Sequence, residues 1–232
     1  MKAELILLAA GSGQRMGGAV QDKVLAPVDG RPVLARALDA FLGTGRISRV
    51  IVVCRDAVQE AAVGALFAEE RWPVPHVCVR GGAERADSVR AGLAVTEEAS
   101  PLVAIHDGAR PLIRSATIHA ALEAAGRVGA AVVAHRVTDT IKRVPMTAPN
   151  QPLPLEDLDR LRLWAMETPQ VFRRDWIVEG YRRAAGSLTD DAAAVSALGH
   201  PVCLVENPFP NPKVTHADDL AWVEHLLHGA RP

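Results

Sequence analysis

The residues of this chain best suited to chemistry lie in a glycine-containing loop that follows the first apolar run. Gly11 and Gly13 have no side chains, so backbone N–H groups in this loop can approach a triphosphate closely. Two cations, Arg15 and Lys23, follow in the same stretch. Such charges stabilise the negative charge that grows when the α-phosphorus is attacked and pyrophosphate leaves. The loop therefore favours chemistry on a nucleoside triphosphate.

Two common phosphate-binding motifs fit this loop poorly. The dinucleotide-binding fingerprint needs a small residue where Met16 stands, and an acid about 20 positions further on at the end of the second strand. The acid nearest to that strand end is Asp56, which comes too late. The P-loop motif needs Gly-Lys-Ser or Gly-Lys-Thr, and neither follows. An NAD-dependent oxidoreductase therefore fails on its fingerprint.

Lysine is scarce in this chain, which gives weight to its position. Lys and Arg total 26, and only four of these are lysines: Lys2, Lys23, Lys142 and Lys213. A single loop cation is usually a solvated surface charge. In a chain so rich in Arg, however, a lysine beside a phosphate-binding loop suggests a need for a compact ammonium group. We therefore interpret Lys23 as functional.

A parallel sheet is expected to position these residues. Apolar runs at 5–8, 50–53, 76–79, 102–105 and 130–133 alternate with helical patterns at 32–42, 57–67, 84–95 and 116–128. Continuous apolar strands that alternate with helices indicate a mostly parallel sheet covered on both faces. Ligands bind such sheets at the carboxyl ends of the strands, where the glycine loop and Asp107 lie.

The alternation stops after residue 133. Residues 136–163 form a polar, proline-rich segment that is too long for an ordinary connection, so we expect it to be either disordered or functional. Beyond it, Thr189, Asp190 and Asp191 predict a helix start before residues 192–198. A strand at 201–205 and a closing helix at 218–227 complete the chain.

Composition narrows the class of protein. The net charge of −1 gives no reason to expect a nucleic-acid or anionic-membrane partner. The apolar N-terminal run is too short for a membrane span, and we interpret it as a core strand. Cys54, Cys78 and Cys203 lack metal-ligand spacing and are interpreted as buried free thiols of a cytoplasmic protein. His225 and His228 have no third ligand nearby and are expected to be exposed.

Six segments in one order carry a specific resemblance. They are AAGSGQRM (9–16), GGAERADS (81–88), HDGARP (106–111), DTIK (139–142), TPQ (168–170) and NPKVT (211–215). Together they cover nearly the whole chain and resemble the 2-C-methyl-D-erythritol 4-phosphate cytidylyltransferase family of the non-mevalonate isoprenoid pathway. Asp22-Lys23-Val24 departs from the Pro-Lys-Gln usual in that family. The resemblance implies a Rossmann-like, mostly parallel sheet sandwiched by helices, in one nucleotidyltransferase domain over residues 1–232.

The resemblance also implies a nucleotide site. The CTP phosphates would be bound by Ala9, Ala10, Gly11 and Gly13. The transition state would be stabilised by Arg15 and Lys23, and cytosine would be recognised by Gly81, Gly82 and Ser88. The nucleophile would be the phosphate of the substrate, which is largely dianionic above a second pKa of about 6, so no general base is required. We expect Mg²⁺ as the cofactor, held mainly by the CTP phosphates, with Asp107 as the carboxylate expected near it.

The acceptor site follows from the same resemblance. Residues around methylerythritol phosphate would be Asp107, Arg110, Thr168 and Lys213, with Asp107 and Lys213 also catalytic, and Thr140 and Arg160 would reach it from the partner of a homodimer. The segment 136–163 would be the projecting dimerisation arm. Two alternatives stay open: ribitol 5-phosphate as the acceptor, and a nucleotide-binding regulatory module without turnover.

Overall fold

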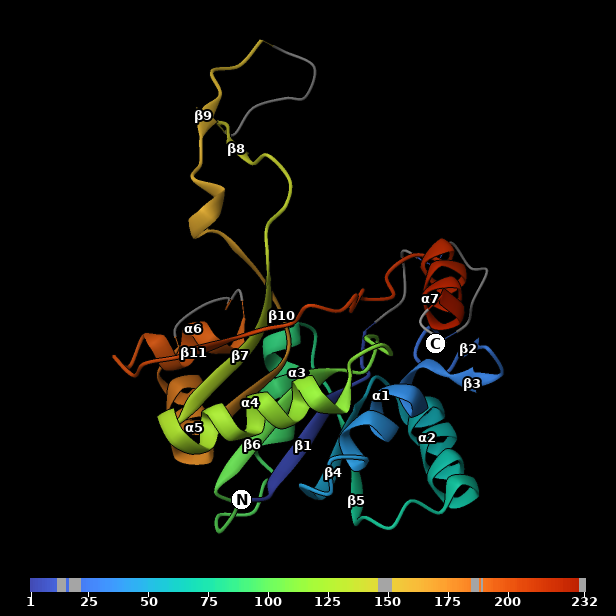
Figure 1. The fold of residues 1–232 in the computed structure, drawn as a ribbon. Helices are drawn as coiled ribbons and strands as arrows, with labels where there is room; N and C mark the ends of the chain where they lie inside the picture. The colour runs from blue at the N-terminus through green and yellow to red at the C-terminus, as the bar shows by residue number, and fades with distance from the viewer. Residues whose placement is uncertain (12–15, 17–21, 146–151, 185–187, 189, 230–232) are drawn as a thin grey trace.

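The protein is built on a seven-stranded sheet of order β11-β7-β10-β6-β1-β4-β5 (Figure 1). The computed structural model describes residues 1–11, 16, 22–145, 152–184, 188 and 190–229. The strands are β1 (Ala3–Leu8), β4 (Ile47–Cys54), β5 (His76–Arg80), β6 (Leu102–Asp107), β7 (Ala130–Arg136), β10 (Trp164–Arg173) and β11 (Cys203–Glu206). Neighbouring strands are parallel, except that β10 runs antiparallel to both β6 and β7. The predicted mostly parallel α/β sheet is confirmed.

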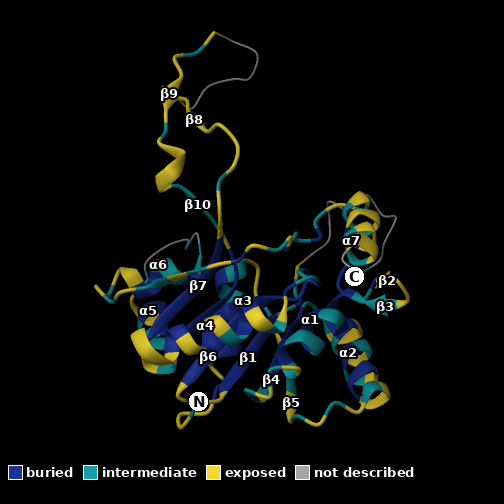
Figure 2. Ribbon diagram, viewed as in Figure 1, coloured by how far each residue is buried: buried dark blue, intermediate teal, exposed yellow. Residues whose placement is uncertain are grey.

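Helices cover both faces of this sheet. One core contains side chains of α1 (Val33–Leu42), α2 (Ala57–Glu70) and α4 (Ser115–Val128), and the other contains side chains of α3 (Arg85–Leu93), α5 (Arg174–Arg183) and α6 (Asp191–Ser196). In β1, Leu5 and Leu7 belong to the first core and Ile6 to the second, because alternate side chains point to opposite faces. The dark blue strands of Figure 2 are buried, and a strand buried on both faces is mostly apolar.

The longest elements that were not predicted from the sequence are β10 and α5. The strand β10 contains Glu167, Thr168 and Gln170, which are buried polar residues, and its Thr168–Pro169 peptide bond is cis. Strands are normally recognised by apolar or alternating patterns, so a strand with several polar residues and a proline is difficult to predict from the sequence.

The expectation that all three cysteines are buried is wrong for two of them. Cys54 is buried, but Cys78 and Cys203 are only partly buried, and all three are free. The reason is their position in the sheet, since β5 and β11 form its two edges and are covered less completely than the central strands.

The segment between β7 and β10 projects away from the sheet (Figure 1). It carries the short antiparallel pair β8 (Lys142–Arg143) and β9 (Glu156–Asp157), followed by the 3₁₀ turn η2 (Arg160–Arg162). Its described residues are mostly exposed, as Figure 2 shows. A segment so exposed contributes little to the core, which agrees with its polar, proline-rich sequence.

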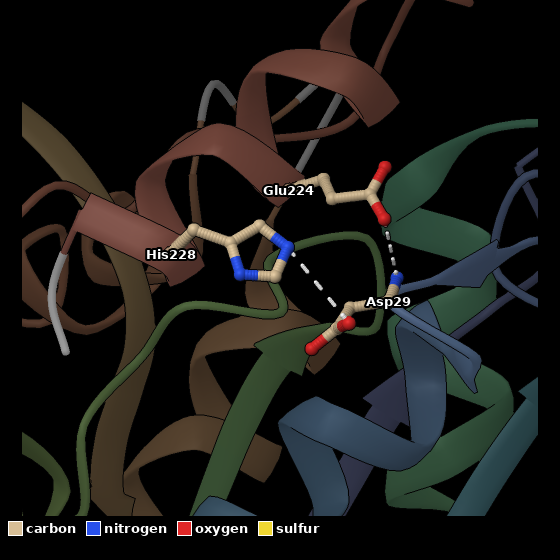
Figure 3. Close-up of side chains that lie close together, drawn as sticks. All are labelled: Asp29, Glu224 and His228. Carbon is tan, nitrogen blue, oxygen red and sulfur yellow. Dashed lines mark hydrogen bonds and ion pairs between the residues drawn. The ribbon is translucent and has the colours of Figure 1, made fainter.

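The last helix, α7 (Asp218–Gly229), docks on the hairpin of β2 (Pro27–Val28) and β3 (Arg31–Pro32). At the hairpin turn, the Asp29 N–H donates to Glu224 Oε1 at 3.2 Å, and His228 Nε2 lies 3.8 Å from Asp29 Oδ1 (Figure 3). The start of α7 is fixed by Asp219, whose carboxylate accepts from the backbone N–H groups of Thr215 and His216. This docking anchors the loop that precedes α7. None of the helices in the described part of the chain is long and apolar enough to cross a membrane.

Candidate active site

A cavity of about 610 Å³ opens where β1, β4 and β6 end. It is lined by residues 8–11 after β1, by residues 82–85 and Ser88 at the start of α3, and by Lys23, Asp107 and Lys213. This is the edge at which a parallel sheet binds ligands, because the loops after the strands meet there. Segments far apart in the sequence thus form one site.

The glycine loop contributes residues 9–11 to the cavity wall. A Cβ atom built on Gly11 would lie 3.6 Å from Lys23 Cε, which is an ordinary van der Waals contact. The protein alone therefore tolerates a methyl group at Gly11, and any need for glycine there would come from a bound phosphate. Gly13 and Arg15 lie outside the described residues.

Lys23 is held at the cavity from both sides. It is 8% exposed, and its Nζ donates to the Val214 carbonyl oxygen at 3.1 Å. The residue before it, Asp22, accepts a 2.6 Å hydrogen bond from Gln59 Nε2 and a 3.1 Å bond from the N–H of Val24. The aspartate that stands where the family usually has proline is thus an anchor for the lysine.

The other end of the cavity is formed by closely packed small residues. A Cβ atom on Gly81 would lie 2.5 Å from Ser88 Oγ and 2.7 Å from Ala10 Cβ, and one on Gly82 would collide with Asp87. Both glycines are therefore required by packing alone. Ser88 is 5% exposed and lines the cavity together with Gly82. The glycine loop and the 81–88 segment therefore lie close together, although Gly81 itself does not line the cavity.

Asp107 lies at the end of β6 among three cations. Its Oδ2 is 2.7 Å from Lys213 Nζ and 3.8 Å from Arg110 Nε, and its Oδ1 is 3.4 Å from Arg85 Nε. Burial raises the pKa of this carboxyl, but Lys213, Arg85 and Arg110 outweigh burial and hold the pKa well below its usual value. Asp107 is therefore ionised at neutral pH.

Behind Asp107, hydrogen bonds hold two residues that were predicted to bind the acceptor substrate, Thr168 and Arg110. Thr168 Oγ1 accepts from the Asp107 N–H at 3.1 Å and lies 3.0 Å from His106 Nδ1. Arg110 Nη1 donates to the Asn211 carbonyl oxygen at 2.7 Å, in the loop that carries Lys213. Neither Thr168 nor Arg110 lines the cavity itself. Their hydrogen bonds support the charged side chains of the cavity.

Arg85 and Glu167 are among the residues of this region that were not predicted from the sequence. Arg85 lines the cavity and forms a two-pronged ion pair with Asp191 in addition to its contact with Asp107. Glu167 is 4% exposed, and its Oε2 accepts from the side-chain amides of Asn207 and Asn211, at 3.0 and 2.7 Å. Glu167 thus ties the Lys213 loop to β10. Arg85 could have been identified from its place in the 81–88 segment. Glu167 could have been identified because it directly precedes Thr168-Pro169-Gln170.

The two predicted arm residues do not reach the cavity of their own chain. Thr140 and Arg160 are exposed, and Arg160 Nη1 donates to the Thr138 carbonyl oxygen at 2.7 Å within the arm. The segment that carries them projects away from the sheet (Figure 1), and neither residue lines the cavity of its own chain.

Potential metal ligands fall in two places. Glu84 and Asp107 are the carboxylates that line the described part of the cavity, and the Asp107 carboxylate is already engaged by cations. Oxygen donors of this kind suit Mg²⁺, which protein sites often bind through one or two carboxylates plus substrate phosphates. A second group, Asp29, Glu224 and His228, is exposed and does not line the cavity (Figure 3). We assign that second group to helix docking. His225 and His228 are exposed, as expected. The expectation that no further ligand lies near them is wrong for His228, because the fold brings Asp29 and Glu224 next to it.

Comparisons with known proteins agree with this arrangement. The model of the IspD family, 2-C-methyl-D-erythritol 4-phosphate cytidylyltransferase, matches residues 3–229. A relative with that name from Geobacillus thermodenitrificans is 38% identical over 98% of this chain and 97% of its own length. The solved structure of the cytidylyltransferase of the same name from Thermus thermophilus has a TM-score of 0.76 at 32% identity, over 98% of this chain and 100% of that chain. The 4-diphosphocytidyl-2C-methyl-D-erythritol synthase of Anaerococcus prevotii has a TM-score of 0.83 at 24% identity, over 98% of each chain.

Proposed function

The chain belongs to the 2-C-methyl-D-erythritol 4-phosphate cytidylyltransferase family, and on this premise we propose how its cavity works. The reaction transfers CMP from CTP to 2-C-methyl-D-erythritol 4-phosphate and gives 4-diphosphocytidyl-2-C-methyl-D-erythritol and pyrophosphate. Ribitol 5-phosphate is not favoured as the acceptor, because the family and the relatives named above carry the name of the methylerythritol substrate or its product.

The observation that carries the proposal is the meeting of Lys23, Asp107 and Lys213 in one cavity between the glycine loop and the start of α3. A sensor of CTP needs affinity for the nucleotide, whereas cations aimed at one reacting phosphorus favour turnover. We therefore prefer an enzyme to a regulatory module.

CTP binds with its phosphates against residues 9–11 and its cytosine against Gly81, Gly82 and Ser88. The closeness of these two walls, with Gly81 packed against Ala10, supports a nucleotide that lies across both. A pocket closed in this way leaves room for a pyrimidine and backbone groups to recognise its polar edge. Gly13 completes the phosphate loop in this proposal.

The chemical step is a single in-line displacement. An oxygen of the acceptor phosphate forms a bond to the α-phosphorus of CTP, and the bond from that phosphorus to the bridging oxygen of the β-phosphate breaks. The electron pair leaves with pyrophosphate, so no side chain has to remove a proton. Lys23 and Arg15 stabilise the charge on the five-coordinate α-phosphorus and the leaving group.

The acceptor binds between Asp107 and the Lys213 loop. Lys213 turns from Asp107 to the acceptor phosphate and aligns it for attack, which is worth several orders of magnitude in rate when reacting atoms are held close together. Asp107 accepts hydrogen bonds from polyol hydroxyls or from water bound to the metal ion. Arg110 and Thr168 complete the acceptor site.

Mg²⁺ is the proposed cofactor. When bound, it would partly neutralise the triphosphate so that a second anion can approach. Asp107 is the carboxylate that would lie nearest to the ion in this proposal, and the phosphates of CTP would supply most of its ligands.

The protein acts as a homodimer in which each arm completes the site of the other chain. Support comes from the exposed positions of Thr140 and Arg160, on a segment that projects away from the chain's own cavity. Two-fold pairing makes both sites equivalent. A cytoplasmic location is also proposed, because the three cysteines are all unpaired, as is usual in a reducing compartment.

Pyrophosphate release tests the function directly. The assay crosses CTP, UTP, ATP and GTP with methylerythritol 4-phosphate and ribitol 5-phosphate, and reactions without an acceptor serve as controls. We expect release above background only with CTP and methylerythritol phosphate. Equal or faster release with ribitol 5-phosphate would overturn the acceptor, and binding of CTP without any release would favour the regulatory module.

A further inference from the structure

A row of alternating charges runs from the cavity to α6. Lys213 Nζ contacts Asp107 Oδ2 at 2.7 Å, and Arg85 Nε lies 3.4 Å from Asp107 Oδ1. The other two nitrogens of the Arg85 guanidinium, Nη1 and Nη2, donate to Asp191 Oδ1 and Oδ2 at 2.8 and 2.7 Å. One arginine is thus shared between a carboxylate of the site and a carboxylate outside it.

The outer carboxylate is fixed more firmly than the inner one. Asp191 is completely buried at the start of α6, and its Oδ1 also accepts a 2.5 Å hydrogen bond from the Tyr181 hydroxyl of α5. Burial and the nearby Asp191 raise the pKa of Tyr181, so the hydroxyl stays protonated and remains a donor. A guanidinium held by both oxygens of a fixed carboxylate loses most of its freedom. Asp191 therefore determines where Arg85 lies.

Two of the three cations beside Asp107, Lys213 and Arg85, face different demands during the reaction. Lys213 is the nearest cation to Asp107 in the structure, but the proposed function requires it to contact the acceptor phosphate. Once it turns away, Asp107 loses its closest partner and faces a region that has gained several negative charges. Arg85 cannot leave in the same way, since Asp191 holds it.

We propose that Asp191 is a positioning residue for the transfer reaction. By holding Arg85, it keeps the Asp107 carboxylate in place after Lys213 has turned to the acceptor phosphate. The inference rests on the proposed function, from which it takes the movement of Lys213. A purely structural role of Asp191, in docking α6, would lower stability without any dependence on Asp107.

A double-mutant cycle separates these roles. We expect Asp191→Asn to lower kcat by about 100-fold, the scale for displacing a reacting group by about 1 Å. In an Asp107→Asn background the same change should cost less than about threefold, because there is no carboxylate left to position. Independent effects would instead multiply to within about twofold. The control is Asp175→Asn, since Asp175 forms an exposed two-pronged pair with Arg173 and does not line the cavity. Its kcat should equal that of the wild type.

A milder variant covers the case in which Asp191→Asn does not fold. Tyr181→Phe keeps both charges and removes one hydrogen bond to Asp191, so it should lower kcat about threefold or more, again only when Asp107 is present. Two results from an active wild-type enzyme would overturn the inference and leave the proposed function standing. One is a double variant in which the kcat losses of Asp191→Asn and Asp107→Asn multiply. The other is an unchanged kcat in a folded Asp191→Asn protein. A wild-type protein that releases no pyrophosphate from CTP would overturn the proposed function, and this inference with it.

Discussion

Acidification should destabilise the protein through His106, the buried imidazole beside Asp107. Its Nε2 lies 3.2 Å from the Arg110 carbonyl oxygen, which can only accept, so this nitrogen carries the proton of the neutral ring. Nδ1 is then an acceptor, and the Thr168 hydroxyl 3.0 Å away donates to it while accepting from the Asp107 N–H. Protonation of Nδ1 would make it a donor and reverse this bond.

The magnitude follows from the lowered pKa. Burial lowers the pKa of His106 from 6.5 to about 4, although the nearby Asp107 acts in the opposite direction. An unfolded chain binds a proton at this imidazole near pH 6.5, whereas the folded protein does so only near pH 4. The stability conferred by the neutral ring is therefore complete above pH 6.5 and is lost as the pH falls toward about 4. The total loss is about 3 kcal/mol.

Urea unfolding measures this loss. The free energy of unfolding is determined between pH 7.5 and 4.5 for the wild type and for His106→Gln, and the difference between the two slopes isolates the contribution of His106. As a control, replacing the partly exposed His119 by Gln leaves His106 in place and should keep the wild-type dependence. A wild-type stability that falls no more steeply than that of His106→Gln would refute the reasoning.

Three further predictions concern the reaction. Lys23→Ala and Arg15→Ala should each lower kcat by about 100-fold or more, with a smaller change in CTP affinity. The control is Lys2→Ala, at an exposed lysine, which should leave kcat unchanged. Near-normal turnover of the Lys23 or Arg15 variant would contradict the role given to the replaced residue. Chelation of divalent ions should abolish pyrophosphate release and added Mg²⁺ should restore it, and calorimetry should find no tight Mg²⁺ site in the nucleotide-free protein. Equal amounts of Lys23→Ala and Arg160→Ala proteins, unfolded together and reassembled, should regain about one quarter of wild-type activity, because half the dimers are mixed and each has one intact site. No recovery, with subunit exchange confirmed independently, would contradict the shared site.

The central sheet could be predicted from the sequence because its strands are buried on both faces. Strands such as β1 and β4 must be apolar at every central position, which leaves a run that is easy to recognise. The strand β10 lies between β7 and β6, yet its Glu167, Thr168 and Gln170 face polar partners rather than apolar ones. Hydrogen bonds from distant segments offset the cost of burying these polar side chains. Such contacts leave no periodic pattern in the sequence.

The candidate site shows the same division. Lys23, Asp107 and Lys213 follow strand ends or lie in loops with recognisable motifs, and the fold brings all three to one cavity. Arg85 belongs to the 81–88 segment, but its position beside Asp107 depends on its ion pair with Asp191, which is 106 positions away in the chain. Asp191 itself was expected only at a helix start, and it is indeed the first residue of α6. A buried ion pair across such a separation can be recognised only in three dimensions.

A crystal structure of the protein with CTP and Mg²⁺ tests the central claim most directly, namely that this cavity holds the nucleotide for attack at its α-phosphorus. We expect cytosine within hydrogen-bond distance of the backbone at Gly81 and Gly82 and of the Ser88 hydroxyl, and the triphosphate against residues 9–11 with Lys23 Nζ in contact with phosphate oxygens. Lys213 should lie on the side of the α-phosphorus opposite to pyrophosphate, where the acceptor phosphate must enter. A nucleotide bound elsewhere, or one with its triphosphate at the 81–88 segment and its base at the glycine loop, would contradict the account.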